Sequence, residues 1–261
     1  MKIKITKAQG TGNDFIIIYD NKNHDIIKDP NLIQKICDRK NGIGADGLLL
    51  ISKHHYYDYK MDYFNNDGSW ETMCANGARC AALFMYKNNY CKKNITFITG
   101  DGEHRVKIKD NNSISLSMIQ PHFKTNEINS NGYYGRFIDS GAKHFVTLID
   151  KISDDDVKKY GSQIRNDLQF SPDGLNVNFT KIINKNCISV YTYEKGIENM
   201  VLSCGSGSVA TAFYLNQKKK INSPLKIIVP GGEFLLEFNK TWDEVWLVGP
   251  AQLVFETKWN I

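Results

Sequence analysis

The chain repeats itself at a shift of 130 residues. Cys74 lies over Cys204 at this shift (204 − 74 = 130), and each cysteine opens a run of small residues. The runs are Met73–Ala82 and Ser203–Ala212. Their content of Ala and Gly and their few charges are typical of a helix enclosed by other structure on all sides. A repeat of this length implies duplication and predicts a fold of two similar halves.

Further identities in the same register extend across the half-length. They are Phe15 with Phe145, Asp20 with Asp150, Tyr63 with Tyr193, and Gly102-Glu103 with Gly232-Glu233. Several identities in one register favour duplication over chance. We predict an N-terminal half, 1–118, that carries Cys74 and a C-terminal half, 119–261, that carries Cys204, with the last strand able to pack back on the first half. Asn, Ser, Gly and Pro cluster at 118–135, which is typical of a boundary.

Alternating or apolar runs predict strands in both halves. In the first half they are 2–7, 14–19, 47–52, 59–64, 95–98, 105–109 and 114–118. In the second half they are 136–139, 144–149, 176–182, 187–193, 225–229, 233–238, 244–248 and 252–256. The fold class that follows is α+β (mixed α/β), with each half a curled mixed or antiparallel sheet around one central helix.

Capping signals predict the helices. Asp29-Pro30 begins a segment that closes at Gly42, and Ser153 begins its counterpart, which runs to Ile164. The two cysteine helices are expected at about 75–88 and 205–216.

Composition excludes several classes of function. The chain of 261 residues is 41% hydrophobic and 23% charged, with a net charge of +5, as in a soluble globular protein. Basic stretches are not interleaved with aromatic residues, so we expect no nucleic acid as a partner. No apolar run is long enough to cross a membrane and the N-terminus has no signal core, so we expect no membrane partner and a cytoplasmic location.

The six cysteines are expected to be free thiols without a metal. Disulfides are not favoured, because the sequence shows no secretory signal. No C-x-x-C is present, and Cys74 and Cys80 would lie about 240° apart around a helix. A zinc site is therefore not expected.

A cysteine at a helix N-terminus can serve acid–base chemistry. The unpaired backbone N–H groups and the helix dipole favour a thiolate, so we expect a lowered thiol pKa. The N–H groups that follow each cysteine can hold a carboxylate. With two such helix ends facing one α-carbon, one sulfur would remove the α-proton and the other would return a proton from the opposite side. These backbone donors are Ala75, Asn76, Gly205 and Ser206.

Several motifs together resemble the diaminopimelate epimerase family, in the family's order and over essentially the whole chain. They are Gly10–Phe15, Gly42–Gly47, Asn65–Ser69, Met73–Cys80, Tyr193–Gly196, Cys204–Gly207, Pro230–Gly232 and Val248–Ala251. The resemblance implies a cofactor-independent isomerase that converts LL-diaminopimelate to the meso form for lysine and peptidoglycan synthesis. It also allows a homodimer.

The resemblance implies roles for named residues. Cys74 and Cys204 would be the two acid/base groups, with His144 and Glu194 each near one thiol. The small-molecule amino-acid substrate would be bound by Asn13, Asn65, Ala75, Asn76, Asn176, Glu194, Lys195, Gly205 and Ser206.

Two departures from the family keep other functions open. Ala142 stands where the family has Asn, and Lys195 where it has Arg, both at the distal end of the substrate. Lysine keeps the charge but loses the two-pronged contact of a guanidinium. A two-cysteine racemase of another amino acid is therefore an alternative, as is a non-catalytic or thiol-redox protein on the same scaffold, in which both cysteines would be dispensable.

Overall fold

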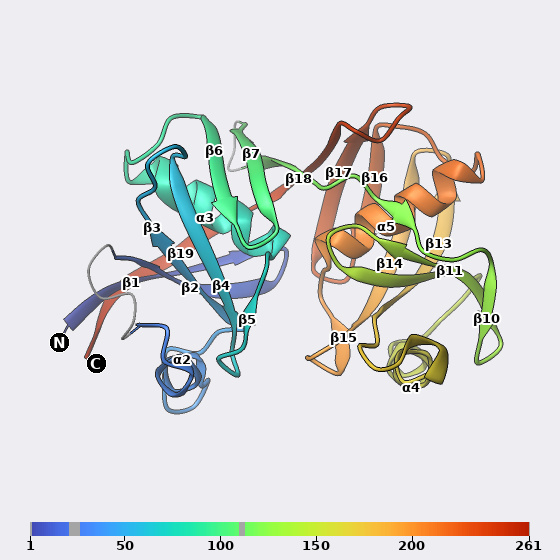
Figure 1. The fold of residues 1–261 in the computed structure, drawn as a ribbon, viewed down its shortest axis with the longest axis horizontal. Helices are drawn as coiled ribbons and strands as arrows, with labels where there is room; N and C mark the ends of the chain where they lie inside the picture. The colour runs from blue at the N-terminus through green and yellow to red at the C-terminus, as the bar shows by residue number, and fades with distance from the viewer. Residues whose placement is uncertain (1, 21–26, 110–112, 261) are drawn as a thin grey trace. The chain divides into compact units, whose positions relative to one another are not determined.

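The chain forms two compact units. Unit 1 comprises Met1–Leu116 with Gly249–Ile261, and unit 2 comprises Ser117–Val248. The structure is a computed structural model that describes residues 2–20, 27–109 and 113–260. Figure 1 shows the elements of each unit.

Unit 1 is a curled mixed sheet around helix α3 (Figure 1). Its elements are β1 (Lys2–Gly10), β2 (Asn13–Tyr19), α2 (Pro30–Cys37), β3 (Gly47–Ser52), β4 (Tyr59–Asn65), β5 (Trp70–Glu71), α3 (Ala75–Lys87), β6 (Asn94–Thr99), β7 (Gly102–Ile108), β8 (Ser113–Ser117) and β19 (Gln252–Asn260). β1 pairs antiparallel with both β2 and β19, so the last strand of the chain lies beside the first. β2 is parallel to β3, and β4 is parallel to β6.

Unit 2 repeats this arrangement around helix α5. Its elements are β9 (His122–Phe123), β10 (Ile128–Ser130), β11 (Tyr133–Asp139), β12 (Lys143–Leu148), α4 (Asp154–Arg165), a 3-10 turn (Leu168–Phe170), β13 (Asn176–Asn184), β14 (Cys187–Glu194), β15 (Asn199–Val201), α5 (Gly205–Gln217), β16 (Leu225–Val229), β17 (Gly232–Phe238) and β18 (Val245–Pro250). β12 is parallel to β13, and β14 is parallel to β16.

The repeat of 130 residues is visible in the structure. Helix α3 begins at Ala75 and α5 at Gly205, and 205 − 75 = 130. The parallel pairing of Phe15 with Gly47 recurs as that of Phe145 with Val177, again 130 residues on. The predicted α+β fold with a central helix in each half is therefore confirmed.

Burial explains the composition of the central helices. Every residue of α3 from Ala75 to Met85 is buried, as is every residue of α5 from Gly205 to Leu215 except Ser206. Small residues let the surrounding strands approach closely. At Gly77 an added Cβ would come within 2.8 Å of the Leu49 side chain. These helices can therefore carry few charges.

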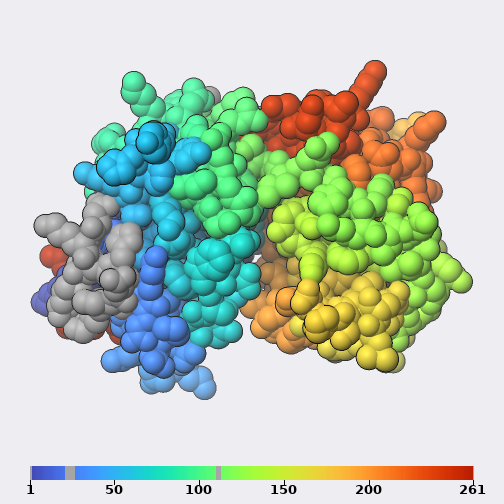
Figure 2. Space-filling view, in the orientation of Figure 1, coloured from blue at the N-terminus to red at the C-terminus, as the bar shows by residue number. Residues whose placement is uncertain are grey.

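Helices α2 and α4 cover the outer face of each sheet, and α4 lies at the surface in Figure 2. Ile33 and Ile36 of α2 pack with buried residues of β1, β2 and β3, whereas Val157 and Ile164 of α4 pack with those of β12 and β13. Each fully buried apolar side chain of this size contributes about 1.5–3 kcal/mol. Because helices lie on both faces, β3 is buried along its whole length.

The N-caps of α2 and α4 were predicted correctly, but the C-terminal end of α2 was not. Asp29 caps α2 with Pro30 in its first turn, and Ser153 forms a capping box with Asp156 at α4. However, α2 ends at Cys37 and not at Gly42, because Asp38 turns into an extended conformation. The short strands β5, β9, β10 and β15 were not predicted. No described helix has the length and apolar character to cross a bilayer.

Candidate active site

Cys74 occupies the N-cap position of α3. Its backbone is extended (φ −130°, ψ 118°), and its carbonyl accepts the first helical hydrogen bond from Ala78 N–H at 2.8 Å. The backbone N–H groups of Ala75 and Asn76 therefore belong to the open first turn, where a helix binds anions. The geometry predicted for this cysteine is present in unit 1.

Amide side chains surround the Cys74 sulfur. The thiol lies 3.7 Å from Asn13 Oδ1, which also accepts a hydrogen bond from Asn76 Nδ2 at 3.2 Å. Asn76 Oδ1 in turn accepts from the Arg79 guanidinium at 2.7 Å. Arg79 is fully buried and also donates to Thr11 Oγ1 at 2.9 Å. Burial lowers the pKa of Arg79 to about 10, so it remains a cation at neutral pH.

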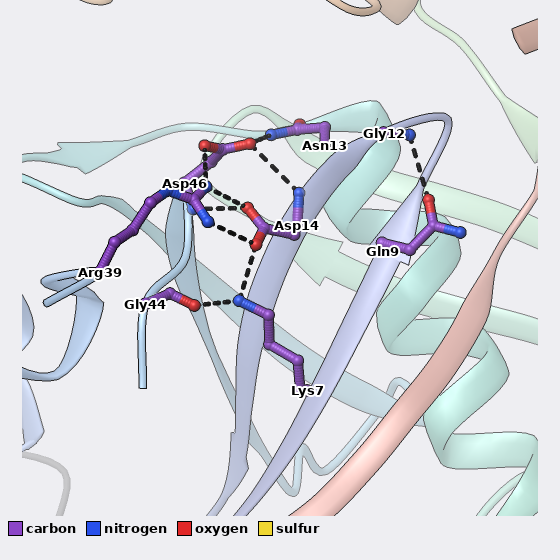
Figure 3. A network of polar contacts seen from close by, with 8 residues as sticks. All are labelled: Lys7, Gln9, Gly12, Asn13, Asp14, Arg39, Gly44 and Asp46. Carbon is purple, nitrogen blue, oxygen red and sulfur yellow. Dashed lines mark hydrogen bonds and ion pairs between the residues drawn. The ribbon is translucent and has the colours of Figure 1, made fainter. Parts of the chain in front are cut away.

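A charged network holds Asn13 in place (Figure 3). Asn13 donates to Asp46 Oδ2 at 2.8 Å, and Arg39 joins Asp46 to Asp14 with contacts of 2.7 Å to each carboxylate. Lys7 contacts Asp14 at 2.7 Å from the other side. Burial alone would raise the pKa of Asp14, but hydrogen bonds from Arg39 and Lys7 outweigh it and hold that pKa well below its usual range. This anchor is therefore charged at neutral pH.

Asn65 lies at the end of β4, opposite Gly47 in the ladder. Its Oδ1 accepts from the Tyr63 hydroxyl at 2.7 Å, and its Nδ2 donates to Ser69 Oγ at 3.1 Å. Gly47 also pairs with Phe15 of β2, two residues after Asn13. The structure thus puts Asn65 on a strand near the Asn13 anchor and fixes its amide.

Cys204 occupies the equivalent position at α5. Its backbone (φ −134°, ψ 114°) nearly matches that of Cys74, and its carbonyl accepts from Ser208 N–H at 3.1 Å. Gly205 and Ser206 form the open first turn. The predicted geometry is therefore present in unit 2 as well.

The protonation of Cys204 differs from the expectation. Burial raises the pKa of Cys204 well above its ordinary value, and the charge of Glu194 and a hydrogen bond to that carboxylate raise it further. Hydrogen bonds from Ser206 and from the Gly207 backbone lower it but do not prevail. The prediction of a lowered pKa is wrong for this cysteine, because desolvation and a neighbouring anion outweigh the helix dipole. Cys204 is a neutral thiol at neutral pH.

His144 contacts the first turn of α5. Its Nε2 lies 3.0 Å from Ser206 Oγ, and its Nδ1 lies 3.0 Å from Asn178 Nδ2. The ring is fully buried, and this burial lowers the pKa of His144 to about 3, against a weaker opposite influence of Asp139. The imidazole is therefore neutral at physiological pH and acts by hydrogen bonding.

Asn176 and Lys195 meet at the ends of β13 and β14. The backbone N–H of Lys195 donates to Asn176 Oδ1 at 2.8 Å, and Asn176 lies opposite His144 in the parallel ladder. Lys143, next to His144, forms an ion pair with Asp173. The unit 2 residues predicted to bind substrate are thus gathered near the N-terminus of α5.

Sequence reasoning missed two polar residues of this region. Asn178 and Thr192 are buried on β13 and β14 and bond to each other at 2.9 Å. A signal did exist, because Asn is disfavoured inside strands and Asn178 holds the ladder position that Leu48 holds in unit 1.

Cys37, Cys80 and Cys91 have surroundings that suit packing. Burial raises the pKa of both Cys37 and Cys80 to about 12 and that of Cys91 to about 11. Such thiols are unreactive at neutral pH. Among the residues that the structure describes, no three His, Cys, Asp or Glu side chains are grouped to hold a metal ion.

Comparison with solved structures shows the fold. A hydroxyproline epimerase from Agrobacterium vitis with bound trans-4-OH-L-proline has a TM-score of 0.75 at 11% identity, over 98% of this chain and 92% of that one. A Bacillus anthracis phenazine biosynthesis protein of the PhzF family has a TM-score of 0.73 at 12% identity, over 100% of both chains. The architecture is therefore one that epimerases and phenazine biosynthesis proteins share.

Comparison of sequences is more specific. The sequence profile of the diaminopimelate epimerase family matches residues 5–123 and 136–254, once for each repeat. A curated diaminopimelate epimerase of Flavobacterium psychrophilum is 42% identical over 98% of this chain and 99% of its own length. One from Chlorobaculum tepidum is 34% identical over 94% of this chain and 97% of its length.

The family profile and the curated relatives define an isomerase of the racemase and epimerase class. Within that class, the chain belongs to the diaminopimelate epimerase family.

Proposed function

We propose that this protein interconverts LL- and meso-diaminopimelate without a cofactor, by proton transfer to and from Cys74 and Cys204, as a step of lysine and peptidoglycan synthesis. One observation carries the proposal: each repeat has a cysteine at the N-cap of its enclosed helix, in nearly the same backbone conformation. The reaction needs two groups that reach one α-carbon from opposite sides. A duplicated fold supplies two equivalent groups.

The proton transfers follow from the chemistry of the thiols. In the LL to meso direction, the Cys74 thiolate removes the α-proton and the Cys204 thiol donates its own proton to the opposite face of the same carbon. The product leaves Cys74 as a thiol and Cys204 as a thiolate, which is the starting state for the reverse reaction. The raised pKa of Cys204 supports its role as the first acid.

The open helix turns support binding of the reacting end of the substrate. Backbone N–H groups of Ala75 and Asn76, and of Gly205 and Ser206, are donors of the kind that hold a carboxylate. The same donors would stabilise the negative charge that develops when the α-proton leaves, because they are fixed before the reaction.

The distal end of the substrate is assigned to Lys195, and Asn65 and Asn176 would hold the substrate. Asn65 and Asn176 are each held by a hydrogen bond of 2.7–2.8 Å to Oδ1, so their amides are oriented in advance. Lys195 supplies a positive charge for the distal carboxylate. A lysine gives less geometric specificity than an arginine at this position.

The test is conversion of LL-diaminopimelate by the reduced protein, followed by chromatographic separation of the isomers. We expect the meso isomer to form, and we expect Cys74→Ala and Cys204→Ala to abolish it. Cys91→Ser is the matched control, because Cys91 lies outside both helix N-termini. A wild-type protein that forms no meso isomer would overturn the assignment of the substrate.

A racemase of another amino acid is the second candidate, and the observation that favours it is Lys143 held by Asp173. An ion-paired lysine has less charge to offer a distal carboxylate. A panel of lysine, ornithine and histidine isomers, assayed beside diaminopimelate, separates the two. Higher kcat/KM for a single-centre amino acid would support the second candidate.

A further inference from the structure

A line of buried polar side chains runs from β14 to the Cys204 sulfur. Thr192 Oγ1 donates to Asn178 Oδ1 at 2.9 Å, and Asn178 Nδ2 lies 3.0 Å from His144 Nδ1. His144 Nε2 lies 3.0 Å from Ser206 Oγ, which is 3.6 Å from Cys204 Sγ. His144 and Asn178 have no exposed surface, and Thr192 is 3% exposed.

The orientation of the Asn178 amide is fixed by its neighbours. Nδ2 lies 3.4 Å from the carbonyl oxygen of Phe145, which can only accept a hydrogen bond. The amide nitrogen must therefore face both this carbonyl and the His144 ring, and the amide oxygen faces Thr192. Amide orientation is assigned from partners in this way.

The amide then fixes the tautomer of His144. Because Asn178 Nδ2 is a donor, Nδ1 of the ring must accept, and the single proton of the neutral imidazole lies on Nε2. Nε2–H in turn donates to Ser206 Oγ. The Ser206 hydroxyl proton is thereby freed to point at the Cys204 sulfur.

Packing leaves this line little freedom. A Cβ on Gly207 would lie 2.3 Å from Asn178 Oδ1 and 3.3 Å from His144 Cε1, so α5 approaches the line as closely as a glycine allows. Ser140 Oγ holds the first turn of α5 by donating to the Ser206 carbonyl at 2.8 Å. The side chains are thus preorganised.

We propose that Asn178 is a positioning residue that sets the tautomer of His144, so that His144 and Ser206 direct a hydroxyl proton onto the Cys204 sulfur. The proposal deepens the proposed function and rests on it. When Cys204 gives its proton to the substrate carbon, it becomes a thiolate in a buried site. The Ser206 hydroxyl and the Gly207 N–H are then the donors that stabilise it, and each upstream hydrogen bond strengthens the next.

Asn178→Asp is expected to reverse the direction of the hydrogen bonds from residue 178 to Ser206, with almost no change in side-chain shape. A carboxylate accepts and cannot donate, so the proton of His144 moves to Nδ1. Nε2 then becomes an acceptor, Ser206 must donate to it, and the sulfur loses its hydroxyl donor. The matched control is Asn216→Asp, because Asn216 is also an amide bonded through both its atoms, at the opposite end of α5.

The tautomer can be read without substrate by two-dimensional NMR of protein labelled with ¹⁵N-histidine, with the His144 signals assigned by loss in His144→Gln. We expect a neutral ring with the proton on Nε2 in the wild type and in Asn216→Asp, and a neutral ring with the proton on Nδ1 in Asn178→Asp. A wild-type ring protonated on Nδ1 overturns the proposal. This result is independent of whether diaminopimelate is the substrate.

Kinetics test the consequence for the sulfur. We expect Asn178→Asp and Ser206→Ala each to lower kcat by at least about tenfold, with KM changed by less than about threefold, because the line acts on proton transfer and not on binding. Thr211→Val is the control for Ser206→Ala, since Thr211 is also a hydroxyl residue of α5 and lies farther from Cys204 along the helix. Unchanged kcat in a folded Ser206→Ala protein would overturn the proposal even if the tautomer is as expected.

Discussion

The N-terminus of α3 in unit 1 and that of α5 in unit 2 have the same backbone and different side chains. The φ and ψ angles of Cys74 and Cys204 differ by only a few degrees. The residue two positions before each cysteine is also held in the same way, by a glycine from a later hairpin. Gly100 N–H donates to the Thr72 carbonyl, and Gly231 N–H donates to the Leu202 carbonyl. The two repeats therefore share the backbone conformation and the backbone hydrogen bonds around the cysteine.

The side chains beside the two thiols differ in kind. Cys74 lies against the amide of Asn13, which neither gains nor loses a proton. Cys204 lies beside Glu194 and beside Ser206, which contacts His144. The charged group that interacts with Cys74 is the cation of Arg79, whereas the one beside Cys204 is the anion of Glu194. The difference suggests how a symmetric frame can hold one thiol protonated while the other acts as a base.

The largest expected effect comes from breaking the pair itself. Cys74→Ala and Cys204→Ala should each lower kcat by about 10²- to 10⁴-fold or more, because each removes one of two required proton-transfer groups. The double variant should be no slower than either single one, since groups that act as a unit are non-additive. Steady-state kinetics with LL-diaminopimelate measure this. A double variant that is slower by the product of the two single effects would show that the thiols act independently.

Glu194→Gln removes the charge that distinguishes the two thiols. Glu194 raises the pKa of Cys204, so its loss should lower that pKa and let the thiolate form at a lower pH. We expect kcat to fall by about tenfold, because the carboxylate that accepts the hydrogen bond of the Cys204 thiol is lost, while burial still keeps that thiol mostly protonated. Alkylation as a function of pH, read at each cysteine by mass spectrometry, should show a lower midpoint for Cys204 and an unchanged one for Cys74. An unchanged Cys204 midpoint would contradict this role.

His144 and Asp14, equivalent in the repeat, should respond to pH in different ranges. The folded pKa of His144 is lowered to about 3 from an ordinary 6.5, so the unfolded chain binds a proton first and stability falls as the pH drops below 6.5. Between pH 6.5 and 5 the loss is about 2 kcal/mol. The pKa of Asp14 is also lowered, but from 3.8, so its contribution is lost only below that pH.

Urea unfolding at pH 7 and pH 5 measures this difference. His144→Gln should remove about 2 kcal/mol of the pH dependence, whereas the exposed His122→Gln serves as the control. Equal pH dependence in wild type and His144→Gln would mean that the ring is not held neutral by burial.

The smallest effect is expected at the charged anchor of unit 1. Arg39→Lys keeps the charge but loses the paired contacts of 3.0 and 2.7 Å to Asp14. Because Arg39 is more than half exposed, we expect a loss of only about 0.5–1 kcal/mol in unfolding free energy. KM should stay nearly constant, since Asp46 still holds Asn13. Urea unfolding measures this loss, with Arg105→Lys, at an exposed position of β7, as the control. A large rise in KM would contradict the prediction.

Regular elements were predictable because their periodicity is local. Strand β3 and strand β16 have the bounds expected from their apolar runs, and the repeat register correctly gave the two cysteine helices. Strands of two or three residues, such as β5 and β15, are too short to show an alternating sequence pattern. They form because neighbouring strands offer pairing partners, which is a tertiary effect.

The site was only partly predictable for a physical reason. The cysteines and their helix turns follow from sequence, because an N-cap is a local feature. The raised pKa of Cys204 depends on burial and on Glu194, which is 10 residues earlier in the chain (204 − 194 = 10) but adjacent in space. The line through Asn178 and Thr192 depends on the pairing of β13 with β14, which sequence reasoning did not specify.

The isotope content of the first product formed tests the two-thiol reaction most directly. LL-diaminopimelate is mixed with reduced protein in D₂O, and early samples are analysed by mass spectrometry. The account predicts meso-diaminopimelate with one deuterium at the inverted α-carbon, donated by the exchanged Cys204 thiol, while the remaining LL substrate carries none. Product that keeps the substrate's own hydrogen would mean that a single group removes and returns it, and would contradict the account.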